Sequence, residues 1–214
     1  MDAMQKAAEK GGARLGGVFQ HRFDPVTAAM KKAVDAGLFG DVLNAGAFIR
    51  CFRGPDYYAG GEWRGTWDGE GGAVLINQAI HSIDVMQWLA GPVRTVWGRY
   101  ANLKLQDVIE TEDTAGALLE LDGGGTATIE ATSASHLSFD AGVHFYGTKG
   151  SFRLSTGGEN QVEFLRTDTE ESAAEVQKLL AGAKNDTGPI REGKACYGNS
   201  HGRQIDDFIN AVLE

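Results

Sequence analysis

Long hydrophobic runs are missing from this sequence, and their absence excludes one large class of proteins. No stretch of about 18 consecutive apolar residues occurs, which is the length that a membrane-spanning helix needs. The first residues, MDAMQKAAEKGG, carry charges where a secretory signal peptide would have its apolar segment. The sequence therefore predicts a soluble, cytoplasmic protein with no membrane partner.

Cysteine and positive charge are also scarce. The two cysteines, Cys51 and Cys196, lie far apart and have no neighbouring Cys or His at the spacing of a zinc site, so neither a disulfide framework nor a metal site is indicated. Lys and Arg number 20 against 29 Asp and Glu, which gives a net charge of -9. Because nucleic-acid binding needs clustered basic side chains, the sequence favours small-molecule or protein partners and no nucleic acid.

The composition that remains is that of a globular protein, with 42% hydrophobic and 23% charged residues. Residues 2–10 predict a helix and residues 14–20 a short apolar strand. Further helices are predicted over residues 25–36, 73–89, 172–180 and 201–213, and strands over residues 42–52, 93–103, 111–121, 126–134, 141–146, 151–154 and 161–165. Consecutive strands with short connections indicate an α+β fold, in which helices cover one face of an open, mostly antiparallel sheet.

Residues 53–72 have no periodic pattern and are rich in glycine and aromatic side chains. Loops of this length are usually functional or disordered, and the aromatic content argues against disorder. Trp63 or Trp67 could stack on the face of a sugar, and Arg64 could pair with a carboxylate or phosphate of a substrate. The alternative, that the tryptophans attach the loop to the core, is equally open.

The helix that follows this loop carries polar side chains at helical spacing. Asn77 and His81 are four residues apart and Asp84 is three further on, so the three side chains lie along one face. This arrangement can present an amide and an imidazole to a ligand beneath the loop, although the spacing alone favours buried polar residues with a structural role. His81 and Asp84 supply only two ligands, which is too few for a metal site.

Several segments together resemble one known family. Residues Gly69–Gly91 are similar to the signature helix of the glucose-fructose oxidoreductase, inositol dehydrogenase and rhizopine-catabolism family (Gfo/Idh/MocA). Four other segments recur in that family in the same order: Phe19–Pro25, Ala36–Val42, Phe145–Leu154 and residues 201–212. The resemblance covers nearly the whole chain and is specific as a set.

The resemblance implies a division into domains. Family members have an N-terminal Rossmann domain that binds NAD or NADP, followed by an α+β domain that shapes the substrate pocket and builds oligomers. Residues 1–20 would then be the last helix and strand of the Rossmann domain, and residues 21–214 the substrate-binding and oligomerisation domain. No G-x-G-x-x-G motif follows a predicted strand, so the cofactor site is expected to be mostly absent and the chain alone inactive. Apolar positions on the strands of residues 93–146 predict a homo-dimer or tetramer formed through the open sheet.

The family resemblance also implies a reaction and roles for single residues. The reaction is oxidation of a hydroxyl of a sugar, cyclitol or nucleotide-linked sugar, in which the carbon gives hydride to the nicotinamide and a side chain accepts the hydroxyl proton. His81 matches the pocket histidine of the family and is the expected acceptor. Asn77 stands where many members have aspartate, so it can orient a hydroxyl but cannot take its proton. Gln78 and Arg22 are expected to be substrate-binding residues. Gln78 would face the loop or the neighbouring domain, and Arg22 would line the domain junction or cap a strand end.

Two further hypotheses remain open at this point. The chain could be a non-catalytic domain whose open sheet is an interaction surface, or an α+β lyase or sugar-binding domain that uses no nicotinamide. An interaction domain would not need an imidazole and an amide beside an aromatic loop, and the partial Rossmann unit of residues 2–20 argues against the third hypothesis.

Overall fold

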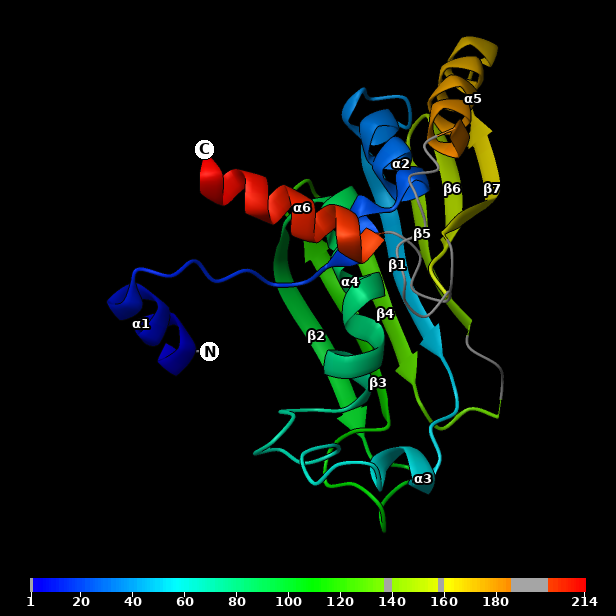
Figure 1. Ribbon diagram of the computed structural model, residues 1–214. Helices are drawn as coiled ribbons and strands as arrows, with labels where there is room; N and C mark the ends of the chain where they lie inside the picture. The colour runs from blue at the N-terminus through cyan, green and yellow to red at the C-terminus, as the bar shows by residue number, and fades with distance from the viewer. Residues whose placement is uncertain (1, 137–139, 158–159, 186–199) are drawn as a thin grey trace.

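The computed structural model describes residues 2–136, 140–157, 160–185 and 200–214 (Figure 1). Seven strands form one sheet in the order β2-β3-β4-β1-β5-β6-β7. β1 pairs with β4 in parallel, and the other neighbouring pairs are antiparallel. The strands are β1 (Val42–Arg50), β2 (Val93–Ala101), β3 (Thr114–Leu121), β4 (Thr126–Thr132), β5 (Asp140–Gly147), β6 (Gly150–Ser155) and β7 (Gln161–Thr167). The predicted α+β class with an open, mostly antiparallel sheet is confirmed.

Helices α2 (Pro25–Asp35), α4 (Ile80–Ala90) and α5 (Glu170–Asn185) lie on one face of the sheet (Figure 1). Helix α2 begins as predicted after Asp24, whose carboxylate accepts hydrogen bonds from two amides of the first turn. The apolar sides of the three helices meet the inward-facing side chains of the strands in one core. Large fully buried members are Met30, Phe39, Val85, Met86, Phe145, Phe152, Leu154 and Val176.

The opposite face of the sheet carries exposed apolar side chains. The strand register places Trp97 beside Leu118 on neighbouring strands, and the same row ends at Phe164 on β7. These three side chains are exposed by 55%, 47% and 39%. Since alternate residues of a strand point to opposite faces, this row lies on the side away from the helix-covered core.

The N-terminal segment differs from its prediction. Helix α1 (Asp2–Gly11) forms as expected, but it buries no residue and lies apart from the rest of the chain (Figure 1). Residues 14–20, predicted as a strand, pair with no strand, and a short 3-10 helix, η1 (Gln20–Phe23), begins at the end of this range. The strand prediction for residues 14–20 was wrong. A strand forms only where its backbone groups can bond to a neighbouring strand, and no strand of the described sheet pairs with this segment.

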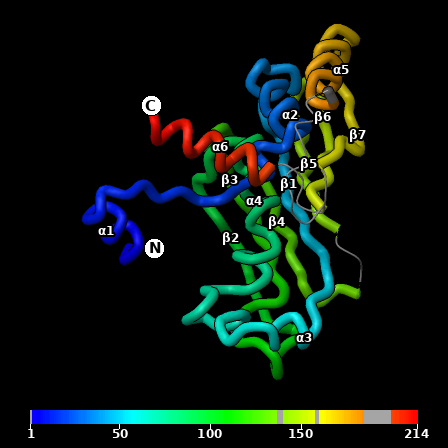
Figure 2. Tube along the Cα trace, viewed as in Figure 1, coloured from blue at the N-terminus to red at the C-terminus, as the bar shows by residue number. Residues whose placement is uncertain are grey.

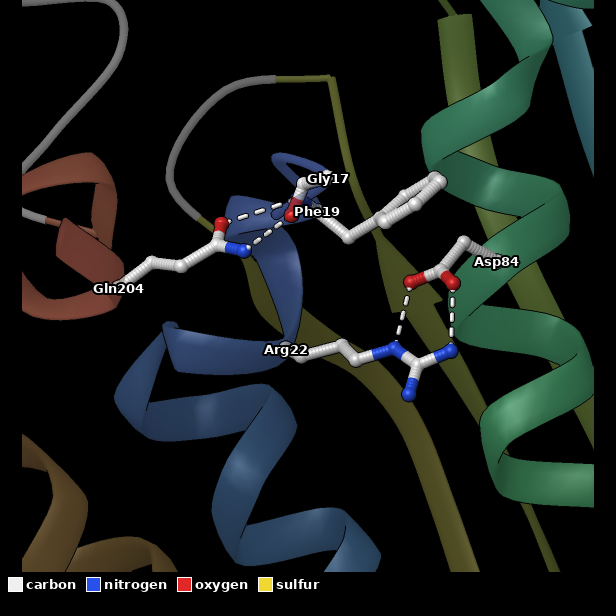
Figure 3. A network of polar contacts seen from close by, with 5 residues as sticks. All are labelled: Gly17, Phe19, Arg22, Asp84 and Gln204. Atoms are coloured by element: carbon white, nitrogen blue, oxygen red, sulfur yellow. Dashed lines mark hydrogen bonds and ion pairs between the residues drawn. The ribbon is translucent and has the colours of Figure 1, made fainter. Parts of the chain in front are cut away.

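Helix α6 (Ser200–Leu213) holds the end of this extended segment. The Gln204 side chain accepts a hydrogen bond from the Phe19 amide at 2.9 Å and donates one to the Gly17 carbonyl at 2.8 Å (Figure 3). These bonds pair the Phe19 amide and the Gly17 carbonyl, which a neighbouring strand would pair in a sheet. Both ends of the chain lie on the same side of the molecule (Figure 2).

Two sequence expectations concern membranes and metals. In the described part of the chain, no helix has both the length and the apolar character needed to cross a bilayer. No group of three or more His, Cys, Asp or Glu side chains in the described ranges is placed to hold a metal ion. Cys51 is buried with a free thiol, and Cys196 lies outside the described residues.

Candidate functional site

The helix with the polar stripe is not one continuous α-helix. Residues Val74–Ala79 (η2) form a π-helical stretch, and α4 begins at Ile80. The prediction of a single helix over residues 73–89 was correct in location and wrong in geometry, because the period of apolar residues does not distinguish a short π-helical turn from an α-helical one. Asn77 and His81 belong to two different groups of side chains.

The first group, here called the amide cluster, consists of Arg53, Tyr57, Glu70, Asn77 and Gln78. The Tyr57 hydroxyl donates to Asn77 Oδ1 at 3.3 Å, and Gln78 Nε2 donates to both Asn77 Oδ1 at 2.9 Å and the Tyr57 hydroxyl at 3.1 Å. Asn77 Nδ2 donates to Glu70 Oε1, and the Arg53 guanidinium donates to Gln78 Oε1 at 2.8 and 3.1 Å. The two amides are therefore fixed in orientation by charged and phenolic partners on the preceding loop.

Residues 53–72, here called the aromatic loop, lie over this cluster and are only partly attached to the core. The Arg64 guanidinium sits 4.7 Å from the Tyr57 ring centroid and 5.1 Å from that of Trp63. Trp63 and Trp67 are each about half exposed. Tyr58, in the short helix α3 (Pro55–Tyr58), is the buried aromatic, and its hydroxyl lies 3.3 Å from Ser133 Oγ. Tyr58 therefore attaches the loop to the core and leaves both tryptophans accessible.

The second group, here called the histidine cluster, forms around His81. Its ring meets the rings of His21 and Phe19 edge to face, at centroid distances of 5.6 and 6.4 Å. His81 Nδ1 is buried and has no hydrogen-bond partner among the residues that the structure describes. Burial lowers the pKa of His81, the nearby His201 lowers it further, and the carboxylate of Asp84 opposes the shift. His81 is thus an uncharged imidazole at neutral pH, the form that can accept a proton.

His21, to which the sequence assigned no role, belongs to the same cluster. Burial and then the proximity of His81 lower its pKa to about 4, with a further lowering from His201. His21 is therefore neutral over the physiological range, and it adds no positive charge next to His81. No sequence spacing could have found this contact, because the two histidines are brought together by the docking of η1 on α4.

Arg22 has a partner inside the protein. Its Nε donates to Asp84 Oδ2 at 2.8 Å and its Nη2 to Oδ1 at 2.5 Å, a two-bond ion pair (Figure 3). The guanidinium also lies 5.4 Å from the Trp88 ring centroid. This ion pair fastens η1 to α4 and so brings His21 against His81. The contacts of Arg22 give it a structural role at the junction of these elements, and substrate binding by Arg22 stays a prediction.

The π-helical stretch η2 and α4 together are here called the site helix. A cleft of about 480 Å³ runs along the side of this helix that faces β2 and β3. Ile76 and Ile80 of the helix form one wall, and Val96 and Tyr100 of β2 form the other. The Trp67 ring lies 5.8 Å from that of Tyr100, which places the aromatic loop next to this wall. The cleft is thus a mainly apolar hollow beside the residues that carry the polar groups.

Sequence reasoning found most of these residues and missed others. Among the described residues the structure brings Asn77, Gln78 and Arg64 together through Tyr57. Arg53 and Glu70, which fix the two amides, were not predicted. The sequence contained no signal for them beyond their place in a polar, aromatic loop.

Comparison with known proteins identifies the family. Residues 27–153 match the sequence profile of the GFO/IDH/MocA C-terminal domain. The chain belongs to this family. It is 28% identical over 150 residues to scyllo-inositol 2-dehydrogenase (NAD(+)) of Bacillus subtilis, a match that spans 69% of the chain and 42% of that enzyme.

Solved structures show the same relationship. The WlbA dehydrogenase of Bordetella pertussis, in complex with NADH and UDP-GlcNAcA, has a TM-score of 0.80 and 27% identity over 98% of this chain and 57% of its own. WlbA of Chromobacterium violaceum, also with NADH and UDP-GlcNAcA, has a TM-score of 0.71 and 25% identity over 97% and 63%. The chain therefore spans less than two thirds of the length of these relatives, which are a cyclitol dehydrogenase that uses NAD(+) and two dehydrogenases solved with NADH and UDP-GlcNAcA.

What the site offers is a neutral imidazole, a fixed pair of amides and an adjoining apolar cleft. These groups can orient a polyhydroxylated ligand and accept a proton from it.

Proposed function

We propose that this chain is the substrate-binding part of an NAD- or NADP-dependent oxidoreductase that oxidises a hydroxyl of a sugar, cyclitol or nucleotide-linked sugar. The observations that carry the proposal are the neutral imidazole of His81 and, one helical turn before it, the oriented amide pair Asn77–Gln78. Loop residues bind the amide pair, and the same helix forms one wall of the apolar cleft. A non-catalytic surface has no need of a base and oriented amides on one helix.

Each group has a stated part in the proposed reaction. A nicotinamide, supplied by a separate nucleotide-binding domain, would take hydride from the carbon that bears the hydroxyl. His81 accepts the hydroxyl proton, since its lowered pKa leaves the ring uncharged at neutral pH. Asn77 and Gln78 bind neighbouring hydroxyl groups of the substrate, because amides both donate and accept hydrogen bonds.

The aromatic loop is proposed to close over the substrate. Trp63 and Trp67 are exposed enough to stack on a sugar ring or base, and Arg64 lies between two aromatic rings with its Nε buried and without a hydrogen-bond partner in the described residues. A substrate with a carboxylate or phosphate suits this guanidinium. The likeness to WlbA, solved with UDP-GlcNAcA, supports a nucleotide-linked sugar as the first substrate to test.

We further propose the domain division, with residues 1–20 belonging to a Rossmann domain and residues 21–214 forming the substrate-binding and oligomerisation domain. The exposed state of α1 and of the segment after it supports this division. Exposed apolar side chains of that segment and of α6 support it too, because such side chains normally lie against another protein surface. They are Met4, Leu15, Val18, Ile205, Phe208, Ile209 and Val212.

The proposed function is tested by titrating the 22.8 kDa chain with NADH and NADPH and following nicotinamide fluorescence. The same chain, isotope-labelled, is then titrated with UDP-GlcNAcA and scyllo-inositol while the His81 ring resonances are recorded. We expect no tight cofactor binding, and we expect one of the two ligands to shift the His81 resonances. These resonances are assigned by their loss in a His81→Gln variant.

Two outcomes would contradict the proposal in different ways. Tight binding of NADH or NADPH by this chain would show that the cofactor site lies within it, and the domain division would be wrong. No response of His81 to either ligand or to a wider panel of sugars, sugar acids and cyclitols would argue against substrate binding here and favour a non-catalytic interaction domain.

We also propose that the uncovered face of the sheet joins copies of this chain in a homo-dimer or tetramer. Trp97 and Leu118 are neighbours on this face, and Phe48 packs beside His144 at a centroid distance of 4.4 Å. Exposed apolar and aromatic side chains on an open sheet form a surface that a second copy can bury.

Light scattering after size exclusion should therefore give a mass of two or four chains at micromolar concentration. The double variant Trp97→Asp with Leu118→Asp is expected to give monomers, because two carboxylates would have to be buried in the interface. Glu175→Lys, on the exposed surface of α5, is the control that should leave the mass unchanged. A monomeric wild-type chain under these conditions would overturn the proposal.

A further inference from the structure

The π-helical start of the site helix has no capping side chain of its own. The residue before it, Ala73, cannot accept a hydrogen bond through its methyl group, and the first helical amides need partners from elsewhere. Glu112, 39 residues further along the chain, supplies them. Its Oε1 accepts hydrogen bonds from the amides of Ala73 and Leu75, both at 3.0 Å, and its own carbonyl accepts one from the Val74 amide at 3.2 Å.

Glu112 is itself fixed to the sheet. It is 3% exposed and stands two residues before β3, in the connection from β2. The next residue, Asp113, donates its amide to the Ala101 carbonyl and accepts the Ser133 amide through its own carbonyl. The carboxylate therefore joins the first turn of the site helix to the end of the sheet, and its negative charge suits the partial positive charge of a helix N-terminus.

This turn sets the positions of two amide side chains, those of Asn77 and Gln78. Neighbouring residues of a regular helix do not face the same way, yet Asn77 and Gln78 both bind the Tyr57 hydroxyl. Their shared orientation occurs inside the π-helical stretch that Glu112 holds at its start. A small rotation of this turn would separate the two amides, because Gln78 Nε2 is bonded to both Asn77 and Tyr57.

We propose that Glu112 is a positioning residue for substrate binding, which acts by holding the π-helical turn in the register that orients Asn77 and Gln78. This inference rests on the proposed function for its kinetic consequence, but the positioning itself is a structural property of the chain. Glu112 touches no substrate in this proposal. Its effect reaches the ligand only through the two amides.

The first test reads the amides directly and needs no substrate. In the ¹⁵N-labelled chain, the side-chain NH₂ resonances of Asn77 and Gln78 are assigned by their loss in Asn77→Ser and Gln78→Glu variants. Glu112→Ala is expected to displace both pairs of resonances, and Glu112→Gln, which keeps an acceptor oxygen without the charge, to displace them less. Glu175→Ala, an exposed carboxylate on α5, is the matched control and should leave them in place.

The second test uses the enzyme in which this chain is joined to a nucleotide-binding domain, with the sugar that the ligand panel identifies. Glu112→Ala is expected to raise KM by about tenfold with kcat little changed, because misplaced amides weaken ground-state and transition-state binding alike. Glu112→Gln should raise KM by less than about threefold. A merely destabilising change would instead lower the amount of folded protein without raising the KM of the remainder.

The outcomes separate this inference from the proposed function. Unchanged Asn77 and Gln78 resonances in Glu112→Ala overturn the positioning role, whatever the activity. Displaced resonances in a protein that binds no sugar uphold the positioning and contradict the proposed function. If Glu112→Ala fails to fold, Glu112→Gln decides the question, and resonances identical to those of the wild type would then overturn the proposal.

Discussion

Replacing His81 by Gln is expected to lower kcat by about 10²–10⁴-fold in an enzyme that joins this chain to the proposed nucleotide-binding domain, because general base catalysis contributes an effect of that size. Glutamine keeps much of the side-chain volume and its hydrogen-bonding capacity, so the histidine cluster can stay packed. It has no nitrogen that accepts a proton near neutral pH. The measurement is the rate of NADH formation at saturating substrate.

The pH dependence gives an independent check on the same residue. Burial and the neighbouring His201 place the pKa of His81 below the ordinary value of 6.5. The base must be unprotonated, so kcat/KM should fall as the pH is lowered and His81 takes up its proton, with the midpoint of this acidic limb below pH 6.5. The acidic limb should disappear in His81→Gln.

His136→Gln is the matched control, since this histidine is exposed, follows the end of β4 and belongs to neither cluster. It should retain wild-type kcat and the wild-type pH profile. A His81→Gln variant that is folded and as active as the control would show that another group accepts the proton.

Replacing Asp113 by Ala is expected to lower the free energy of unfolding by about 3–5 kcal/mol, the cost of removing several backbone hydrogen bonds to a buried carboxylate. Asp113 is fully buried, and its carboxylate accepts hydrogen bonds from the backbone amides of Leu103, Lys104 and Leu105. These three amides form the turn between β2 and β3. Alanine would remove this acceptor from the Leu103 and Lys104 amides and leave the Leu105 amide with Asn102 Oδ1 as its acceptor.

The pKa of Asp113 indicates how strongly the ionised form is favoured. Burial by itself raises the pKa of this carboxyl, but the backbone hydrogen bonds outweigh burial and lower it. A lowered folded-state pKa means that this stabilisation is complete above pH 3.8, the ordinary value for aspartate, and is lost only as the pH falls through the folded-state value. The stabilisation is therefore fully present at pH 7.

Urea denaturation at pH 7, followed by tryptophan fluorescence, measures the loss. Asp122→Ala, in the exposed turn after β3, is the control and should cost about 1 kcal/mol or less, because its contacts with Arg94 are made in solvent. Equal effects of the two substitutions would show that the buried hydrogen bonds of Asp113 contribute no more than a surface ion pair.

The order and type of the elements could be predicted because each rests on local patterns. The Asp24 cap begins α2, and alternating side chains mark β1 with Ala45, Ala47 and Ile49 toward the core. The glycine at position 124, with a φ of 87°, closes the turn between β3 and β4. These signals act over a few residues, so no tertiary contact was needed to read them.

The candidate site could be predicted only in part. His81, Asn77 and Gln78 were found because they are close in sequence and resemble a known motif. His21 and Glu112 were missed, because His21 reaches His81 only when Arg22 docks η1 on Asp84, and Glu112 reaches Ala73 only through the return of the chain from β2 to β3. The π-helical turn depends on the same long-range contact.

The sequence by itself determined the class of fold, the family and the helix that carries the site, because periodicity, caps and motifs are properties of neighbouring residues. Only the tertiary structure decided which side chains surround that helix. It divided the predicted polar face into an amide cluster and a histidine cluster, and it left residues 14–20 without a strand partner. Burial, charge proximity and the pairing of backbone groups depend on segments far apart in the chain, and no local pattern records them.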